Sequence, residues 1–150
     1  QITADYAGKD LVLIGVLKGS VIFMADLMRA IDLKMSIDFM AVSSYKDGTV
    51  SSGDIEILKD LTNPIRGKDV IIVEDIVDTG ETAVHLMKEL GSKNPASLKL
   101  ATALFKPVAL KHEVVPDYVG FEVAPDFLVG YGLDYDGLGR NLNDIYVLKP

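Results

Sequence analysis

Two short, continuous apolar runs constrain the fold of this chain most strongly. Residues 11–16 (LVLIGV) and 70–73 (VIIV) have no polar member, as is typical of parallel strands buried on both faces. Each run precedes a segment with helical spacing of apolar residues, at 21–31 and 82–90, and the second helix is predicted to end at Gly91. Further strands are predicted at residues 37–41, 55–61, 97–104, 118–121, 127–129 and 145–148. This alternation predicts an α/β fold, with a mainly parallel twisted sheet flanked by helices.

The length and the connections favour one domain over residues 1–150. A chain of 150 residues is large enough for one core, and no repeat or linker divides it. The one long irregular stretch, residues 43–54 (SSYKDGTVSSGD), predicts a mobile loop or hairpin tip. Loops of that length in compact domains are mostly functional lids or disordered segments.

Composition excludes several kinds of chemistry. The chain has no cysteine and two histidines, His85 and His112, so it offers no disulfide scaffold, thiol nucleophile or Cys-ligated zinc. Its net charge of −7 argues against binding to nucleic acid, and its most apolar stretch, residues 11–25, is too polar to span a membrane. We therefore expect a cytoplasmic protein whose chemistry depends on carboxylates, lysines and backbone groups.

Residues 70–82 (VIIVEDIVDTGET) carry the clearest functional signal. They predict a buried strand ending in Glu74 and Asp75, followed by Asp78 and by a small-residue turn that opens a helix. Ligands of open parallel sheets bind at the carboxyl ends of strands, and a helix N-terminus favours phosphate. Carboxylates beside a phosphate suggest Mg²⁺ or hydrogen bonds to sugar hydroxyls. Two other interpretations stay open at this point: an acidic pair that only solubilises a strand end, and a phosphorelay receiver domain.

The same segment resembles the signature of the type I phosphoribosyltransferases. Residues 13–20 (LIGVLKGS), 43–45 (SSY), 105–107 (FKP) and 125–142 (PDFLVGYGLDYDGLGRNL) resemble, in the same order, blocks of the hypoxanthine-guanine phosphoribosyltransferases. The resemblance implies that family's fold in an N-terminally shortened form, with a core at about 1–121. A small hood carrying the purine pocket would comprise about 122–150 plus a missing N-terminal piece.

The resemblance also implies a reaction. It is the Mg²⁺-dependent transfer of the 5-phosphoribosyl group from phosphoribosyl pyrophosphate to N9 of hypoxanthine or guanine, giving IMP or GMP in purine salvage. Asp78 matches the general base. The residues that match phosphoribosyl pyrophosphate contacts are Lys18, Gly19, Glu74, Asp75, Asp78, Thr79, Gly80, Thr82 and Arg140. The matching metal ligands are Glu74, Asp75 and Asp134, and the matching lid residues are Ser44 and Tyr45.

The purine contacts implied by the resemblance come from two segments. Lys106 matches the lysine that reads the purine O6, Phe127 the aromatic residue that stacks on the base, and the Leu128 backbone the group that reads the N1/N2 edge. Asp134 matches a carboxylate beside the pocket. Phe105 departs from the pattern, since an aspartate is common there. In this family the peptide bond that corresponds to Leu17–Lys18 can be cis.

Two alternatives to an active salvage enzyme remain. One is a phosphoribosyltransferase-like regulator that binds nucleotides and RNA without significant catalysis, against which the net charge of −7, Lys106 and Phe127 argue. The other is a catalytically dead or truncated fragment, since the chain starts at Gln1. The expected partners are phosphoribosyl pyrophosphate, a 6-oxopurine and further copies of the chain in a homodimer or homotetramer, with no nucleic acid and no membrane.

Overall fold

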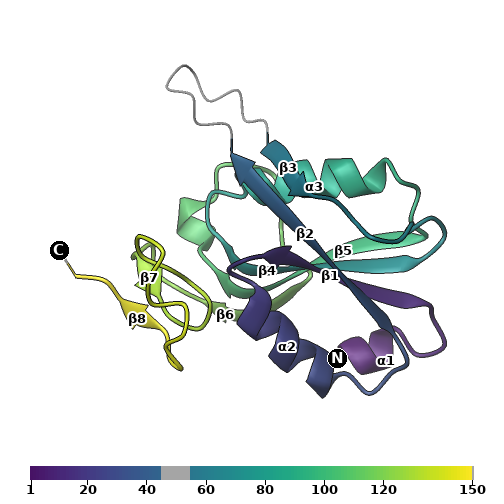
Figure 1. Ribbon diagram of the computed structural model, residues 1–150, viewed down its shortest axis with the longest axis horizontal. Helices are drawn as coiled ribbons and strands as arrows, with labels where there is room; N and C mark the ends of the chain where they lie inside the picture. Colours follow the sequence, from purple (N-terminus) through teal and green to yellow (C-terminus); the bar gives the residue numbers. More distant parts are fainter. Residues whose placement is uncertain (45–54, 150) are drawn as a thin grey trace.

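The fold is built on one central sheet. A computed structural model describes residues 1–44 and 55–149, so the predicted lid residue Tyr45 and the rest of the loop at 45–54 lie outside the described residues. Six strands form the sheet in the order β3-β2-β1-β4-β5-β6 (Figure 1). Their bounds are β1 Leu11–Leu17, β2 Ser36–Ser44, β3 Ile55–Lys59, β4 Asp69–Val77, β5 Ser97–Phe105 and β6 Tyr118–Glu122. All neighbours pair in parallel except β2 and β3, which confirms the predicted mainly parallel sheet.

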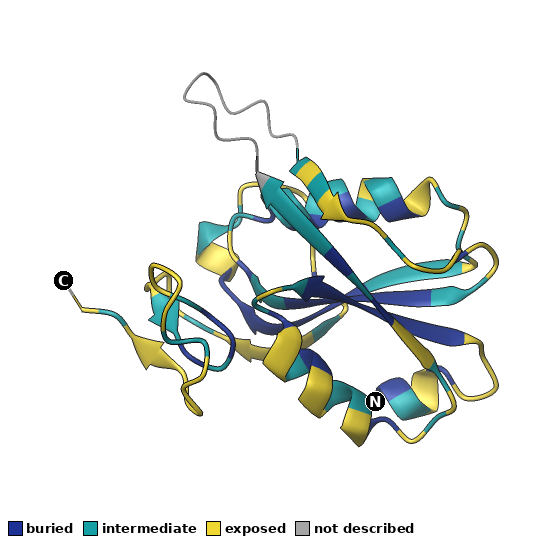
Figure 2. Cartoon of the chain, viewed as in Figure 1, coloured by how far each residue is buried: buried dark blue, intermediate teal, exposed yellow. Residues whose placement is uncertain are grey.

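Helices cover both faces of this sheet because its central strands are apolar on both sides. On one face, Val12 and Ile14 of β1 pack with Leu86 and Leu90 of α3 (Glu81–Gly91). On the other, the alternate residues of β1 and β4 pack with α1 (Ile2–Asp5) and α2 (Val21–Ala30). The two layers lie above and below the sheet in Figure 1, and Figure 2 shows that burial concentrates in the central strands.

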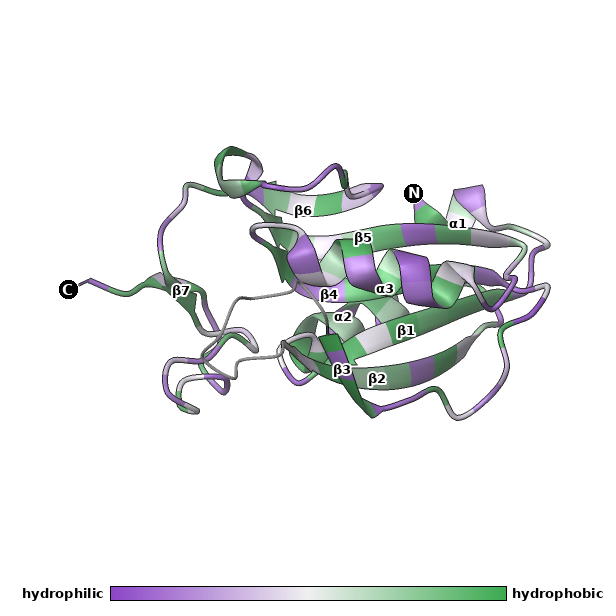
Figure 3. Cartoon of the chain, turned by 90° about the horizontal axis from the view of Figure 1, so that it is seen from above, coloured by the Kyte–Doolittle hydropathy of each residue, from purple (hydrophilic) through white to green (hydrophobic). Residues whose placement is uncertain are grey.

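A smaller unit follows β6 and is called the hood here (described residues 123–149). It contains the two-stranded antiparallel sheet of β7 (Leu128–Val129) and β8 (Tyr146–Val147). Leu133 and Leu128 of the hood pack with Ala103 and Leu104 of β5 and with Phe23 of α2. Viewed from above, the hood lies beyond the ends of the central strands, on the same side as the C-terminus (Figure 3). No helix among the described residues has the length and apolar character needed to cross a membrane.

Element boundaries differ from the predictions in two informative places. Strand β4 continues through Glu74 and Asp75 to Val77, so the acidic pair lies inside the strand rather than at its end. Continued pairing with β5, as far as Val77 opposite Phe105, explains the extension. The short helix α1 was not predicted, since four residues carry too little periodicity to be recognised. The helix end at Gly91 is confirmed.

Candidate active site

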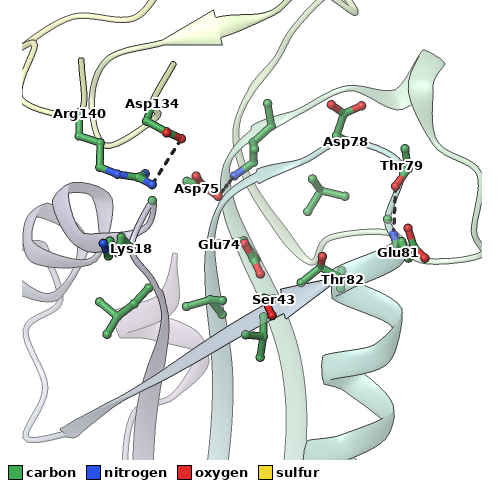
Figure 4. Close-up of a pocket in the computed structure, with 18 residues that line it drawn as sticks. Lys18, Ser43, Glu74, Asp75, Asp78, Thr79, Glu81, Thr82, Asp134 and Arg140 are labelled. Atoms are coloured by element: carbon green, nitrogen blue, oxygen red, sulfur yellow. Dashed lines mark hydrogen bonds and ion pairs between the residues drawn. The ribbon is translucent and has the colours of Figure 1, made fainter. Parts of the chain in front are cut away.

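A cavity of about 570 Å³ opens where β1 and β4 end, beside the start of α3 (Figure 4). In the sheet order β1 lies between β2 and β4, so the chain reverses its direction of winding here, which is where open α/β sheets bind ligands. The cavity brings together ten predicted site residues: Lys18, Gly19, Glu74, Asp75, Asp78, Thr79, Gly80, Thr82, Asp134 and Arg140.

The acidic pair forms the buried floor of the cavity. Glu74 is only 7% exposed, and its Oε1 has no hydrogen-bond partner among the described residues. Burial raises the pKa of Glu74 well above its usual range, and the adjacent Asp75 carboxylate raises it further. Burial also raises the pKa of Asp75, although the Ile76 N–H donates to its Oδ1 at 2.8 Å. Two neighbouring carboxylates with an unpaired oxygen suit a cation or a set of donated hydroxyl groups.

The loop after β1 lies directly against this pair. The peptide bond between Leu17 and Lys18 is cis, and the exposed Lys18 is followed by Gly19. A Cβ atom at position 19 would overlap Asp75 Oδ2, so only glycine lets the loop approach the carboxylate this closely. The loop therefore presents its backbone and a lysine ammonium group next to the acidic floor.

The segment that opens α3 turns through a left-handed glycine at the edge of the cavity. Gly80 is the N-cap residue with a φ of 87°, a left-handed conformation that glycine adopts without strain. The Glu81 N–H donates to Thr79 Oγ1 at 3.3 Å. Thr79 and Thr82 line the cavity, and free N–H groups of the first helical turn face the same region. Glu81 also lines the cavity and adds a negative charge beside this turn.

Asp78 is held by a lysine from the neighbouring strand end. The Lys106 Nζ donates to Asp78 Oδ2 at 3.1 Å. The Lys106 side chain is 8% exposed, whereas that of Asp78 is 48% exposed. The buried ammonium thus has a carboxylate partner that also lines the cavity.

Arg140 and Asp134 reach the cavity from the hood. Arg140 Nη2 lies 3.3 Å from Asp134 Oδ1, and Arg140 Nη1 donates to the Gly132 carbonyl at 2.7 Å. The Gly137 N–H donates to Asp134 Oδ2 at 2.8 Å. These contacts hold the guanidinium opposite the loop that carries Lys18 (Figure 4).

Other predicted residues lie outside the cavity lining. Phe127 is 54% exposed and stacks edge-on against Tyr135, with ring centroids 5.9 Å apart, and Leu128 lies in the hood strand β7. Neither lines this cavity, and Lys106 is joined to it through Asp78. Ser44 is the last residue of β2. The site residues named from the sequence did not include Val16, Val42 and Ser43, which do line the cavity. Val16 and Ser43 lie within the resembling segments 13–20 and 43–45, and the places of all three near the ends of two adjacent parallel strands could have indicated them.

The donor set fits Mg²⁺ only in part. Among residues 1–44 and 55–149, no group of three or more His, Asp or Glu side chains is arranged to hold a metal ion. Mg²⁺, however, usually binds one or two carboxylates and completes its shell with water and substrate phosphates. The unpaired Glu74 Oε1 beside Asp75 fits that pattern.

Comparisons with known proteins agree with this geometry. Residues 1–136 match the sequence model of a family described as "Phosphoribosyl transferase domain". A hypoxanthine-guanine phosphoribosyltransferase of Staphylococcus aureus is 50% identical over 150 residues, which are 100% of this chain and 84% of that protein.

Solved structures give the same result. A hypoxanthine phosphoribosyltransferase from Staphylococcus aureus superposes with a TM-score of 0.96 at 50% identity, covering 100% of this chain and 82% of that one. A hypoxanthine-guanine phosphoribosyltransferase from Bacillus anthracis superposes with a TM-score of 0.94 at 42% identity, covering 99% of this chain and 88% of that one. The chain therefore belongs to the phosphoribosyltransferase family, and within it to the hypoxanthine-guanine phosphoribosyltransferases.

Proposed function

We propose that this protein transfers the 5-phosphoribosyl group of phosphoribosyl pyrophosphate to N9 of hypoxanthine or guanine. The products are IMP or GMP and pyrophosphate, and the reaction serves purine salvage. The observation that carries the proposal is the contact between Asp78 and Lys106, because it joins the phosphate cavity to a buried cation suited to an oxopurine. The named activity of the relatives supports it.

The Lys106–Asp78 pair matches one edge of the base. In the tautomer of a 6-oxopurine that carries its proton on N7, the O6 acceptor lies beside the N7–H donor, whereas adenine presents an amino donor in place of O6. The Lys106 ammonium donates to O6, and the amino group of adenine would meet it donor to donor. The Asp78 carboxylate, whose Oδ2 lies 3.1 Å from the Lys106 Nζ, accepts from the N7–H of the base. The pair thus distinguishes oxopurines from aminopurines and places a carboxylate where a proton must leave.

Asp78 serves as the proton acceptor. The bond between N9 and C1′ of the ribose forms while the bond between C1′ and the pyrophosphate oxygen breaks, and the electron pair leaves with pyrophosphate. The proton on N7 passes to the Asp78 carboxylate, so the purine attacks without building up positive charge. The Lys106 ammonium holds that carboxylate in place throughout.

The remaining cavity residues hold the phosphoribosyl donor. The turn of Thr79, Gly80 and Thr82 at the start of α3 binds the 5′-phosphate through N–H groups and hydroxyls. Lys18, the backbone at Gly19 and Arg140 bind pyrophosphate, the guanidinium acting as a fork for its oxygens. Our proposal that these groups share one ligand is supported by their positions around one cavity.

Mg²⁺ is the proposed cofactor. Glu74 and Asp75 hold it or the ribose hydroxyls, and Asp134 belongs to a second site near the pyrophosphate. When bound, the ion neutralises the leaving pyrophosphate. The buried, unpaired oxygen of Glu74 supports this assignment.

Several further assignments extend the proposal. Phe127 stacks on the purine, the Leu128 backbone reads its N1/N2 edge, and Ser44 and Tyr45 belong to a lid that excludes water from the donor. We also propose that residues 1–150 act as one domain, in the cytoplasm, as a homodimer or homotetramer.

A direct assay tests the function. The protein is incubated with phosphoribosyl pyrophosphate, Mg²⁺ and hypoxanthine, guanine or adenine, and the nucleotides are separated chromatographically. We expect IMP and GMP, little AMP, and loss of product when EDTA replaces Mg²⁺. No product with either oxopurine would refute the enzyme and favour a regulator that binds nucleotides without catalysis.

A further inference from the structure

One side chain of the hood reaches across to the helix that follows the pyrophosphate loop. The Tyr131 hydroxyl donates to Asp26 Oδ2 on α2 at 2.6 Å, joining residues 105 positions apart. Tyr131 has a φ of 51°, a left-handed conformation that residues other than glycine rarely adopt. Such a conformation persists only where the surrounding contacts hold it. The activity proposed above gives Tyr131 and Asp26 no role.

The backbone beside Tyr131 connects directly to Arg140. The Tyr131 N–H donates to the Leu142 carbonyl and the Gly132 N–H to the Arg140 carbonyl, both at 2.9 Å. The Arg140 side chain returns a hydrogen bond to the Gly132 carbonyl at 2.7 Å. A displacement of Tyr131 is therefore transmitted to both the backbone and the guanidinium of Arg140.

The same short segment touches the pyrophosphate loop. A Cβ atom at position 132 would overlap the carbonyl oxygen of Gly19, so the hood and the loop are packed backbone to backbone there. That loop leads into α2, whose N-cap residue is Ser20. Helix α2 thus starts at the loop and carries Asp26 less than two turns further on.

A second contact on α2 explains why the hydroxyl has a specific effect. Phe23, one turn before Asp26, packs with Leu133 of the hood and Leu104 of β5. This apolar contact fixes the distance between hood and helix but not their relative rotation, because hydrophobic packing is non-directional. The hydrogen bond from Tyr131 supplies the direction.

We propose that Tyr131 and Asp26 are positioning residues that set Arg140 against the Lys18–Gly19 loop for binding of the pyrophosphate group. The proposal rests on the function proposed above. The pKa shifts of the two side chains keep Tyr131 protonated, as the donor, and Asp26 ionised, as the acceptor. Burial and the hydrogen bond to Asp26 raise the pKa of Tyr131 to about 12. The hydrogen bond from Tyr131, with one from Arg29, lowers the pKa of Asp26.

Steady-state kinetics on a double-mutant cycle tests the proposal. The variants are Tyr131→Phe, Asp26→Ala and the double variant, with Asp26→Asn as the conservative replacement. Tyr146→Phe is the matched control, because it also removes a hydroxyl from the hood, at a tyrosine that is 50% exposed. Circular dichroism checks that each variant folds.

We expect Tyr131→Phe and Asp26→Ala each to raise KM for phosphoribosyl pyrophosphate by about threefold to tenfold, the range for one lost hydrogen bond. Both kcat and KM for the purine should stay within about twofold, since only the position of Arg140 changes. The KM of the double variant for phosphoribosyl pyrophosphate should not exceed that of the single variant with the higher KM, because both changes remove the same interaction. Asp26→Asn, whose amide oxygen still accepts, should stay near wild type, as should Tyr146→Phe.

Three outcomes would overturn the proposal. They are additive effects in the double variant, a fall in kcat together with an equal rise in both KM values, and the same rise in KM for phosphoribosyl pyrophosphate in Tyr146→Phe. If the wild type makes no nucleotide, the proposed function fails, and binding then decides this proposal separately. Calorimetric titration of the same variants with Mg²⁺-pyrophosphate should give the same pattern in Kd. Unchanged Kd values across the cycle would refute the positioning role.

Discussion

The ion pair between Lys106 and Asp78 depends on how two neighbouring strands are aligned. The Lys106 side chain is almost fully buried, and its ammonium contacts Asp78, 28 positions earlier in the chain. Strands β4 and β5 run in parallel and end with Val77 opposite Phe105. Asp78 directly follows β4 and Lys106 directly follows β5, so the two residues lie side by side. The Lys106 N–H also donates to the Val77 carbonyl at 3.0 Å. Sequence comparison pointed to both residues, but their pairing depends on the register of the two strands.

Replacement of the acidic partner separates proton transfer from binding. Asp78→Asn keeps an oxygen that accepts from Lys106 but removes the base, so kcat should fall by about 10² to 10⁴. KM for phosphoribosyl pyrophosphate should change by less than about threefold, since the phosphate contacts remain. Initial-rate assays over a range of concentrations of both substrates measure kcat and KM separately. Asp32→Asn, an exposed change before β2, is the control, and a parallel rise in KM would contradict the role as base.

Replacement of the basic partner tests recognition of the base. Lys106→Met keeps the apolar length of the side chain but removes the donor to O6, so KM for hypoxanthine and guanine should rise at least about tenfold. The preference for oxopurines over adenine should shrink as well, because the repulsion between two donors is gone. Competition assays with the three bases measure both effects. The exposed Lys34→Met should behave as wild type, and unchanged guanine affinity in Lys106→Met would remove this lysine from the pocket.

At the scale of elements, the strands were the most predictable part of the fold. The apolar runs that became β1 and β4 are buried on both faces, so hydrophobic pattern alone located them. The end of β4 was not predictable, because Glu74 and Asp75 look like a boundary in sequence, whereas β4 stays paired to β5 at Glu74 and again at Ile76 and Val77. The hood strands β7 and β8 have two residues each and are shorter than predicted. Elements this short depend on tertiary contacts rather than on their own periodicity.

A buried aspartate fixes the connection between β3 and β4. Asp38 of β2 is 8% exposed, and its carboxylate accepts N–H hydrogen bonds from Phe39 at 2.8 Å, Thr62 at 2.9 Å and Asn63 at 3.2 Å. Burial raises the pKa of Asp38, but these hydrogen bonds and the Lys59 ammonium outweigh burial and lower it below the ordinary 3.8. The ionised carboxylate therefore stabilises the folded chain above that pH.

Asp38→Asn should lower the free energy of unfolding by about 1–3 kcal/mol at pH 7, because an amide cannot satisfy all three donors. A pKa lowered by folding contributes stability above the unfolded value, and that contribution is lost as the pH falls through the folded value. The difference between wild type and variant should therefore narrow as the pH falls below 3.8. Thermal unfolding at a series of pH values measures it, with Asp32→Asn as control. A gap independent of pH would contradict the electrostatic explanation.

At the scale of the whole molecule, the net charge is negative, although the cavity contains groups that would bind an anion. The chain carries −7, yet its cavity also holds Lys18, Arg140 and the start of α3. Two cationic side chains and a helix N-terminus therefore share one concave region, which suits a phosphorylated small molecule. Composition alone could argue against nucleic-acid polymers but could not locate this region, since Arg140 reaches the cavity only through the hood.

Binding to RNA provides the whole-molecule test. We expect no retardation of a single-stranded or hairpin RNA in gel-shift experiments at physiological salt, because an acidic surface gains nothing from counterion release. A basic RNA-binding protein run in parallel controls for the assay. A salt-dependent complex at micromolar protein would revive the regulator hypothesis.

The contact between Gly19 and Asp75 also constrains how such a sequence can change over generations. Any side chain at position 19 would overlap the Asp75 carboxylate, so the two positions are not free to vary independently. A larger residue at 19 requires the Asp75 carboxylate to leave the place that it occupies in the floor of the cavity. Selection for this position of the Asp75 carboxylate is therefore enough to preserve a glycine that has no side chain of its own.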